Sequence, residues 1–230
     1  MAKRLWMQRF ARWHVWLGWL IGVPVVMWTA TGLLMVSRPI EEVRGEHLRK
    51  PMAAQPIPPG TQLLALPPAD NVTEITQRMR GGRLEYIATL SDGRKIAYNL
   101  SDNRPAGART AEEAAAIVRQ NIVGGEAIEV VNAFTADAPP FDFRRPVDGY
   151  QVVLESGTRV YVEKATGDIA AVRTGWWRVF DFAWGLHIMD LETREDSSHP
   201  VLILFALLAL VGTMLGCVLM FRRRRAKTGP

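Results

Sequence analysis

Residues 15–36 read VWLGWLIGVPVVMWTATGLLMV, a run of 22 residues without a charged side chain. A hydrocarbon core about 30 Å thick needs roughly 20 helical residues to cross it. Residues 201–221, VLILFALLALVGTMLGCVLMF, form a second charge-free run of 21 residues. We therefore predict transmembrane helices over residues 15–37 and 199–221. The first run exceeds the apolar core of about 7–15 residues in a cleaved signal peptide, so we expect it to be retained.

Basic residues flank both runs on the sides of the two termini: Lys3, Arg4, Arg9 and Arg12 before the first, and arginines 222–225 with Lys227 after the second. By the positive-inside rule, residues 1–14 and the tail 222–230 lie in the cytoplasm. The middle segment holds the other 19 of 28 Lys and Arg against all 23 Asp and Glu, a net charge of −4. We expect a two-pass protein of a bacterial inner membrane with a periplasmic middle segment. The net positive charge of the whole chain thus comes from the basic residues that anchor it in lipid, and no nucleic-acid partner is expected.

The middle segment begins with a polar, proline-rich linker at 38–59, followed by a domain at 60–175. Two stretches within this domain alternate apolar and polar residues around a turn dipeptide, Asp92-Gly93 in one and Ser156-Gly157 in the other. Superposing the two turns requires an offset of 64 residues, which aligns Leu90 with Leu154 and Ile96 with Val160. We predict two copies of one antiparallel hairpin unit, at about 60–105 and 108–172.

A helix is expected before the second hairpin, because Thr110 and Glu113 have the spacing of a capping box. The aromatic stretch 176–198 is predicted to be an amphipathic segment at the membrane interface. The fold class is therefore membrane α plus periplasmic α+β, with two spans flanking a helix-plus-sheet domain.

The stretch GYQVVLESGTRVYVEKATGDI at 149–169 resembles the PepSY domain, a small helix-plus-sheet module of exported proteins. RWHVWLGWLIGVPVVMWTATGLL at 12–34, together with the Leu186-His187 pair before the last apolar run, resembles the PepSY-associated transmembrane family. The resemblance covers both spans and most of the middle, and it is weakest at 60–100. Characterised members of this family include haem-containing reductases. Membership therefore implies an inner-membrane protein that reduces a ferric siderophore.

Three of the four histidines, His14, His187 and His199, lie at predicted membrane edges. A histidine at a membrane edge is either an interfacial side chain or a functional one, because burying an unpaired ionisable group in lipid is expensive. Neutral imidazole is also a common ligand of haem iron. With the family resemblance, we predict that these three histidines ligate haem b. The haem would be non-covalent, because the chain has a single cysteine, Cys217, and no CxxCH motif.

Two further side chains are predicted near the cofactor. Trp184 lies three residues before His187 on the same helical face and is expected to wall the haem, while Arg12 is expected to pair with a propionate. Membrane anchoring is the alternative reading of the aromatic residues, and a salt bridge or a lipid phosphate is the alternative for the arginine.

The predicted topology limits which histidines can share an iron. About 20 helical residues separate the levels of His14 and His187, roughly 30 Å. His187 would pair with His199 if the chain folds back, or each histidine would pair with its mate in a homodimer. Gly18-x-x-x-Gly22 and Gly212-x-x-x-Gly216 offer close-contact strips for assembly.

Two functions from different classes remain open on the sequence. The first is a haem protein that passes electrons across the membrane in reductive iron acquisition. The second is a non-catalytic adaptor subunit of a larger membrane complex, which binds a protein partner through its PepSY domain. No nucleophile elbow, HExxH motif, phosphate loop or nucleotide fingerprint is present, so an electron donor would have to be another protein or a quinol.

Overall fold

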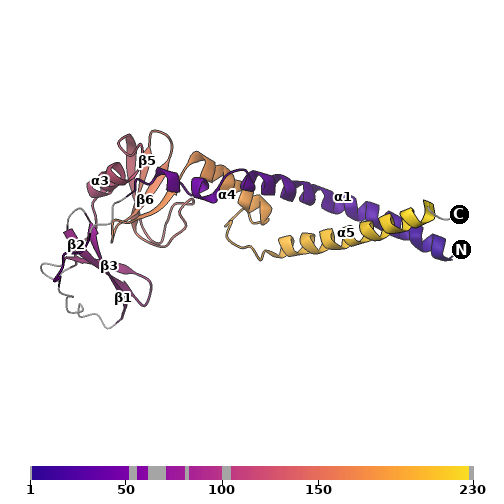
Figure 1. Cartoon of the computed structure of the whole chain (residues 1–230), viewed down its shortest axis with the longest axis horizontal. Helices are drawn as coiled ribbons and strands as arrows, with labels where there is room; N and C mark the ends of the chain where they lie inside the picture. Colours follow the sequence, from indigo (N-terminus) through magenta and orange to yellow (C-terminus); the bar gives the residue numbers. More distant parts are fainter. Residues whose placement is uncertain (1, 52–55, 62–70, 81–82, 100–104, 228–230) are drawn as a thin grey trace. The chain divides into compact units, whose positions relative to one another are not determined.

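The computed structural model describes residues 2–51, 56–61, 71–80, 83–99 and 105–227. Two compact units are present (Figure 1). The helical unit contains Met1–Pro39 and Val179–Pro230, and the sheet unit contains Ile40–Arg178. The predicted arrangement, with two apolar helices flanking a helix-plus-antiparallel-sheet region, is confirmed.

The helical unit is built on α1 (Ala2–Val36) and α5 (Pro200–Lys227). Within them, Gln8–Val36 and Pro200–Phe221 are long and apolar enough to span a membrane. Both helices continue beyond the charge-free runs into the basic flanks. The reason is that residues 2–14 and 222–227 contain no glycine or proline and are rich in good helix formers. Residues 228–230 of the predicted tail lie outside the described residues.

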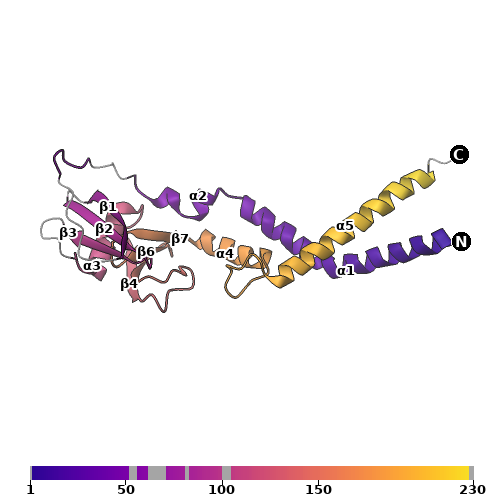
Figure 2. The same ribbon diagram turned by 90° about the horizontal axis from the view of Figure 1, so that it is seen from below.

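α1 and α5 cross each other (Figure 2) and are in contact. Two glycines of α5 face side chains of α1 at this contact. A Cβ atom built on Gly212 would lie 2.8 Å from Ile21 Cδ1, and one on Gly216 would lie 3.0 Å from His14 Cε1. By contrast, a Cβ atom on Gly18 or Gly22 would have nothing within 4 Å. Of the two GxxxG strips, therefore, the one on α5 is used within the chain.

The larger sheet of the sheet unit is antiparallel, in the order β4 (Ile128–Phe134), β5 (Gly149–Leu154), β6 (Arg159–Glu163) and β7 (Ile169–Arg173). One face packs on α3 (Ala111–Asn121), and this core is made by alternate residues such as Val152, Val160 and Val162. α3 begins with the predicted capping box, because Thr110 Oγ1 accepts from the Glu113 N–H and the Glu113 carboxylate accepts from the Thr110 N–H.

The smaller sheet has the order β1 (Val72–Arg80), β2 (Arg83–Leu90) and β3 (Lys95–Asn99). Its β2–β3 hairpin and the β5–β6 hairpin have the same register at the offset of 64 residues: Ala88 faces Ile96, and Val152 faces Val160. Both turns place a glycine at positive φ, Gly93 at 83° and Gly157 at 74°. The preceding strands β1 and β4 also carry a bulge at the same distance from the turn. The two hairpins are therefore alike in geometry as well as in sequence pattern. Most of 60–70, the expected start of the first unit, lies outside the described residues.

The two sheets are joined by ion pairs. Arg109 Nη2 lies 2.6 Å from Glu85 Oε1, and Arg78 Nη1 lies 2.7 Å from Asp168 Oδ1. The remaining short helices of this unit are α2 (Ile40–Val43) and the 3₁₀ helix η1 (Glu46–Leu48).

α4 (Gly175–His187) begins in the sheet unit and ends in the helical unit. The stretch 176–198, predicted as one amphipathic segment, is thus helical only as far as His187, and a loop follows. The helix ends there because Met189 adopts φ 57° and the carboxylate of Asp190 organises the next residues into turns.

Candidate functional site

The C-terminal end of α4 is fixed to α1 through His187. Nδ1 of His187 lies 2.9 Å from Thr31 Oγ1, and Trp28 Nε1 donates to the His187 carbonyl oxygen at 2.8 Å. The ring also lies beside Gly32, where a Cβ atom would be 3.5 Å from His187 Cε1. The three contacts come from a short segment of α1. A residue predicted as a ligand is therefore anchored to the first span.

The Thr31 hydroxyl sets the tautomer of this histidine. Thr31 Oγ1 donates to the Met27 carbonyl oxygen at 2.8 Å, with the Trp28 carbonyl oxygen at 3.1 Å. A hydroxyl has one proton to donate, so with that proton directed to the Met27 carbonyl, the tautomer that completes the contact with His187 is the one that carries its proton on Nδ1. In a neutral imidazole the other nitrogen, Nε2, then keeps its lone pair. This arrangement suits binding of a metal or acceptance of a proton at Nε2.

Arg194, in the loop after His187, holds this loop against α4. Its Nη1 lies 2.6 Å from Asp181 Oδ2, and Asp181 is buried. The side chain of Arg194 covers Gly185, where a Cβ atom would be 2.8 Å from Arg194 Cγ. Trp184 Nε1 donates to the Arg194 carbonyl oxygen at 3.0 Å. The residue predicted to wall a cofactor is therefore half-buried, and its indole N–H is directed to this loop.

Asp190 organises the same loop from within. Its carboxylate accepts from the Thr193 hydroxyl and from the backbone N–H groups of Thr193, Glu195 and Asp196. The Thr193 hydroxyl and these N–H groups hold the pKa of the Asp190 carboxyl well below its usual range. The loop that leads from His187 to α5 is thus held by a carboxylate that stays ionised.

His14 lies at a different level of α1. Its ring faces Gly216 of α5, and its Nδ1 is buried with no hydrogen-bond partner among the described residues. Thr31, which holds His187, is 17 residues further along α1, about 25 Å at 1.5 Å per residue. Because α1 is continuous between them, His14 and His187 of one chain do not meet at one site.

Among the described residues, neither Arg12 nor His199 makes a hydrogen bond with His14 or His187. Arg12 is exposed, and two residues of helix place it about 200° around α1 from His14, on the opposite face. His199 precedes the first residue of α5, and its buried Nδ1 has no partner among the described residues. Across the part of the chain that the structure describes, no three His, Cys, Asp or Glu side chains gather in a way that could hold a bare metal ion.

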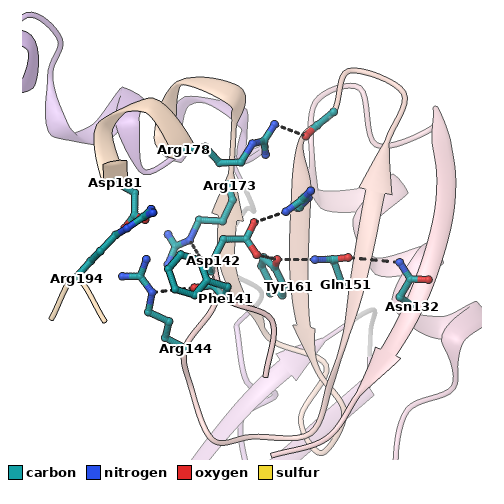
Figure 3. A network of polar contacts seen from close by, with 12 residues as sticks. Asn132, Phe141, Asp142, Arg144, Gln151, Tyr161, Arg173, Arg178, Asp181 and Arg194 are labelled. Carbon is teal, nitrogen blue, oxygen red and sulfur yellow. Dashed lines mark hydrogen bonds and ion pairs between the residues drawn. The ribbon is translucent and has the colours of Figure 1, made fainter. Parts of the chain in front are cut away.

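A polar network in the sheet unit was not predicted (Figure 3). The buried Asp142, in the β4–β5 loop, accepts from the Tyr161 hydroxyl and from Arg159 Nη1 at 3.0 Å. Gln151 Nε2 donates to the Tyr161 oxygen at 2.7 Å, and Asn132 Nδ2 donates to Gln151 Oε1 at 3.4 Å. Burial, and then the hydrogen bond to Asp142, raise the pKa of Tyr161 above its usual range. The available sequence signal was Asp142 between two phenylalanines, an acidic residue in an apolar context.

Comparison with known proteins places these features in context. Residues 11–229 match a protein family described as the PepSY-associated TM region. No curated protein and no solved structure gives a significant match to the chain.

Proposed function

Because this chain belongs to the PepSY-associated transmembrane family, we propose that it is a haem-binding membrane protein that passes electrons across the bilayer. We take the side of the sheet unit to be periplasmic and both termini to be cytoplasmic. The substrate we propose is a ferric siderophore, from which reduction releases Fe(II). The observation that carries the proposal is the Thr31–His187 hydrogen bond.

That bond is the arrangement expected around a ligating histidine. Ligating imidazoles almost always donate their second N–H to an oxygen, which fixes the tautomer and the ring orientation. Here Thr31 takes that role, and Nε2 of His187 is the nitrogen available to iron. Asp181 and Arg194 hold the adjoining loop, which supports the end of α4 from the other side. Haem, when bound, would supply one-electron transfer, and these residues would position it.

A bis-histidine site on each side needs a second imidazole, because His14 and His187 lie at different levels of α1. We propose that it comes from a second copy of the chain. The Gly18–Gly22 strip of α1 supports this proposal, because a Cβ atom at either glycine would meet nothing within 4 Å. Small residues of this kind let helices approach closely in lipid. In this scheme His14 serves the cytoplasmic side and His187 the periplasmic side.

An absorbance spectrum of the full chain, extracted from its own membrane, tests the proposal. Dithionite should produce b-type haem bands, and His187→Ala should remove part of them. His47→Ala is the matched control, because His47 is an exposed histidine of η1 in the sheet unit and should change nothing. Bands that survive both His14→Ala and His187→Ala would rule out the ligand assignment.

Thr31 gives a second readout that depends on its position. Thr31→Val keeps the shape but removes the acceptor, so the midpoint potential should rise because the ligand becomes less basic. Thr31→Ser should restore the native value. A colourless protein that co-purifies with a larger complex would instead establish the adaptor function and contradict the haem proposal.

A further inference from the structure

The β4–β5 loop of the sheet unit presents arginine and aromatic side chains on one surface. Phe143 N–H and Arg144 N–H both donate to the Pro140 carbonyl oxygen, at 2.8 and 3.1 Å, which closes a tight turn. Arg144 adopts φ 57°, unusual for a residue with a side chain. Its Nε donates back to the Phe141 carbonyl oxygen at 2.8 Å, and its guanidinium lies 4.7 Å from the centre of the Phe141 ring.

The first turn of α4 and the end of β7 complete this surface. The guanidinium of Arg173 lies 4.2 Å from the Trp177 ring centre, and that of Arg144 lies 6.0 Å from the same ring. Arg145, the next residue of the loop after Arg144, is exposed. We call these five residues, Phe141, Arg144, Arg145, Arg173 and Trp177, the arginine–aromatic surface (Figure 3 labels three of them).

The surface is held rigidly from behind. Asp142 and Phe143, between its members, are buried, and Phe143 stacks on Tyr161 with ring centres 4.7 Å apart. The Asp142 carboxylate faces Tyr161 (Figure 3) and accepts from Arg159 Nη1. The Asp142 carbonyl oxygen accepts from Arg173 Nε at 2.9 Å. This acidic group is thus directed into the sheet unit. The Phe141 side chain remains 53% exposed, although the adjacent residue, Asp142, is buried.

We propose that the arginine–aromatic surface binds the anionic phospholipid headgroups of the membrane in which the chain is anchored. Guanidinium groups match the phosphate oxygens in a fork geometry, and exposed aromatic rings favour the boundary between headgroups and acyl chains. Trp177 precedes His187 by ten residues of α4, about 15 Å along the helix. His187 contacts Thr31 in the first span, so only a short stretch of chain connects this surface to the membrane-spanning unit.

This proposal is independent of haem, and it is tested on the full chain in nanodiscs. A fluorophore is attached to Ala138→Cys in a Cys217→Ser background, because Ala138 is exposed in the same loop. Doxyl-labelled phosphatidylcholine serves as the quencher, with or without phosphatidylglycerol. Quenching should be stronger with phosphatidylglycerol and should weaken in added salt.

Removing charge should release the loop. Each arginine near an anionic surface contributes a factor of about five to the bound-to-free ratio. Arg145→Gln alone, whose side chain is exposed, should therefore reduce the ratio about fivefold, and Arg144→Gln/Arg145→Gln roughly 25-fold. Arg94→Gln/Arg119→Gln is the matched control, because it removes two exposed charges from other parts of the sheet unit.

The proposal is overturned by quenching that is independent of phosphatidylglycerol or by an equal loss in the control pair. Release by inorganic phosphate at millimolar concentration would indicate a site for a soluble anion and would also overturn it. A fluorophore that responds only in native membrane vesicles would identify a protein partner and would equally refute lipid binding.

Discussion

Replacing the glycines of α5 should separate the two helices of the helical unit, whereas the same replacement in α1 should not. A Cβ atom on Gly212 would lie 2.8 Å from Ile21 Cδ1, and one on Gly216 would lie 3.0 Å from His14 Cε1. Ordinary contacts of a Cβ atom begin near 3.4 Å. Valine adds two methyl groups to each Cβ atom, so the Ile21 and His14 side chains must turn aside or α1 must move away from α5.

Overpacking a close contact costs about 1–3 kcal/mol. The two positions lie one turn apart on one face, so a single displacement of α1 relieves both, and their effects do not add fully. We expect Gly212→Val/Gly216→Val to cost about 2–4 kcal/mol of α1–α5 packing. Gly18→Val/Gly22→Val introduces the same residues into open space and should cost close to nothing within one chain.

Energy transfer between labels on Gln8→Cys and the native Cys217 reports the separation of α1 and α5, since both positions are exposed. In an SDS titration of the micellar protein, diluted until it is monomeric, the Gly212/Gly216 variant should separate at a lower SDS fraction than the control. Equal midpoints for the two variants would refute the packing argument. A loss of self-association in the Gly18/Gly22 variant alone is the result expected if that strip joins two copies.

Three further changes act on single sites. Burial holds the phenol of Tyr161 neutral in the folded state, so its stabilising contribution should be complete below pH 10 and decline as the pH rises further. Tyr161→Phe should lessen that alkaline decline of the unfolding free energy in urea titrations, and an unchanged decline would contradict the assignment. Asp190→Asn should accelerate hydrogen exchange of the three loop amides that bond to the carboxylate. Acid should do the same to the native chain progressively, beginning below pH 3.8 and completely only below the lowered pKa of Asp190 in the folded loop. Unchanged protection in the variant would count against that role. Gly45→Ala places a side chain at φ 72° and a Cβ atom 2.7 Å from Val172 Cγ1, so it should lower the unfolding free energy of the sheet unit by about 3 kcal/mol in urea titrations. Gly107→Ala is the control, because its φ is 78° but the space is open, and it should cost about 1 kcal/mol.

Features that depend on neighbouring residues were predicted from the sequence. The spans follow from two charge-free runs, and the hairpins follow from Asp92-Gly93 and Ser156-Gly157 between alternating strands. The capping box of α3 needs only Thr110 and Glu113. Each of these signals lies within one turn, one strand or one span, so the local chain is enough to specify it.

The candidate site was predicted only in part. His187 could be singled out by the Leu186-His187 pair before the last apolar run and by its place at a predicted membrane edge, and its separation from His14 followed from helix length. The hydrogen-bond partner of the Trp184 indole could not be predicted, because the Arg194 carbonyl oxygen that it contacts lies in a loop without a periodic pattern. The arginine–aromatic surface combines residues from a loop, a strand and a helix that are up to 36 positions apart, and no local pattern connects them.

The sequence by itself determined that two apolar helices flank a helix-plus-sheet domain along the chain, because the length of an apolar run and the alternation of a strand are properties of a continuous segment. Only the tertiary structure decided that His187 meets Thr31 across 156 positions, which glycine strip is used within the chain, and that Asp142 turns inward. The physical reason is that such contacts are chosen by the packing of distant surfaces. In any helix a threonine hydroxyl can donate to the carbonyl oxygen four residues earlier, as Thr31 does. Only the packing of α4 against α1 brings the His187 imidazole to that hydroxyl.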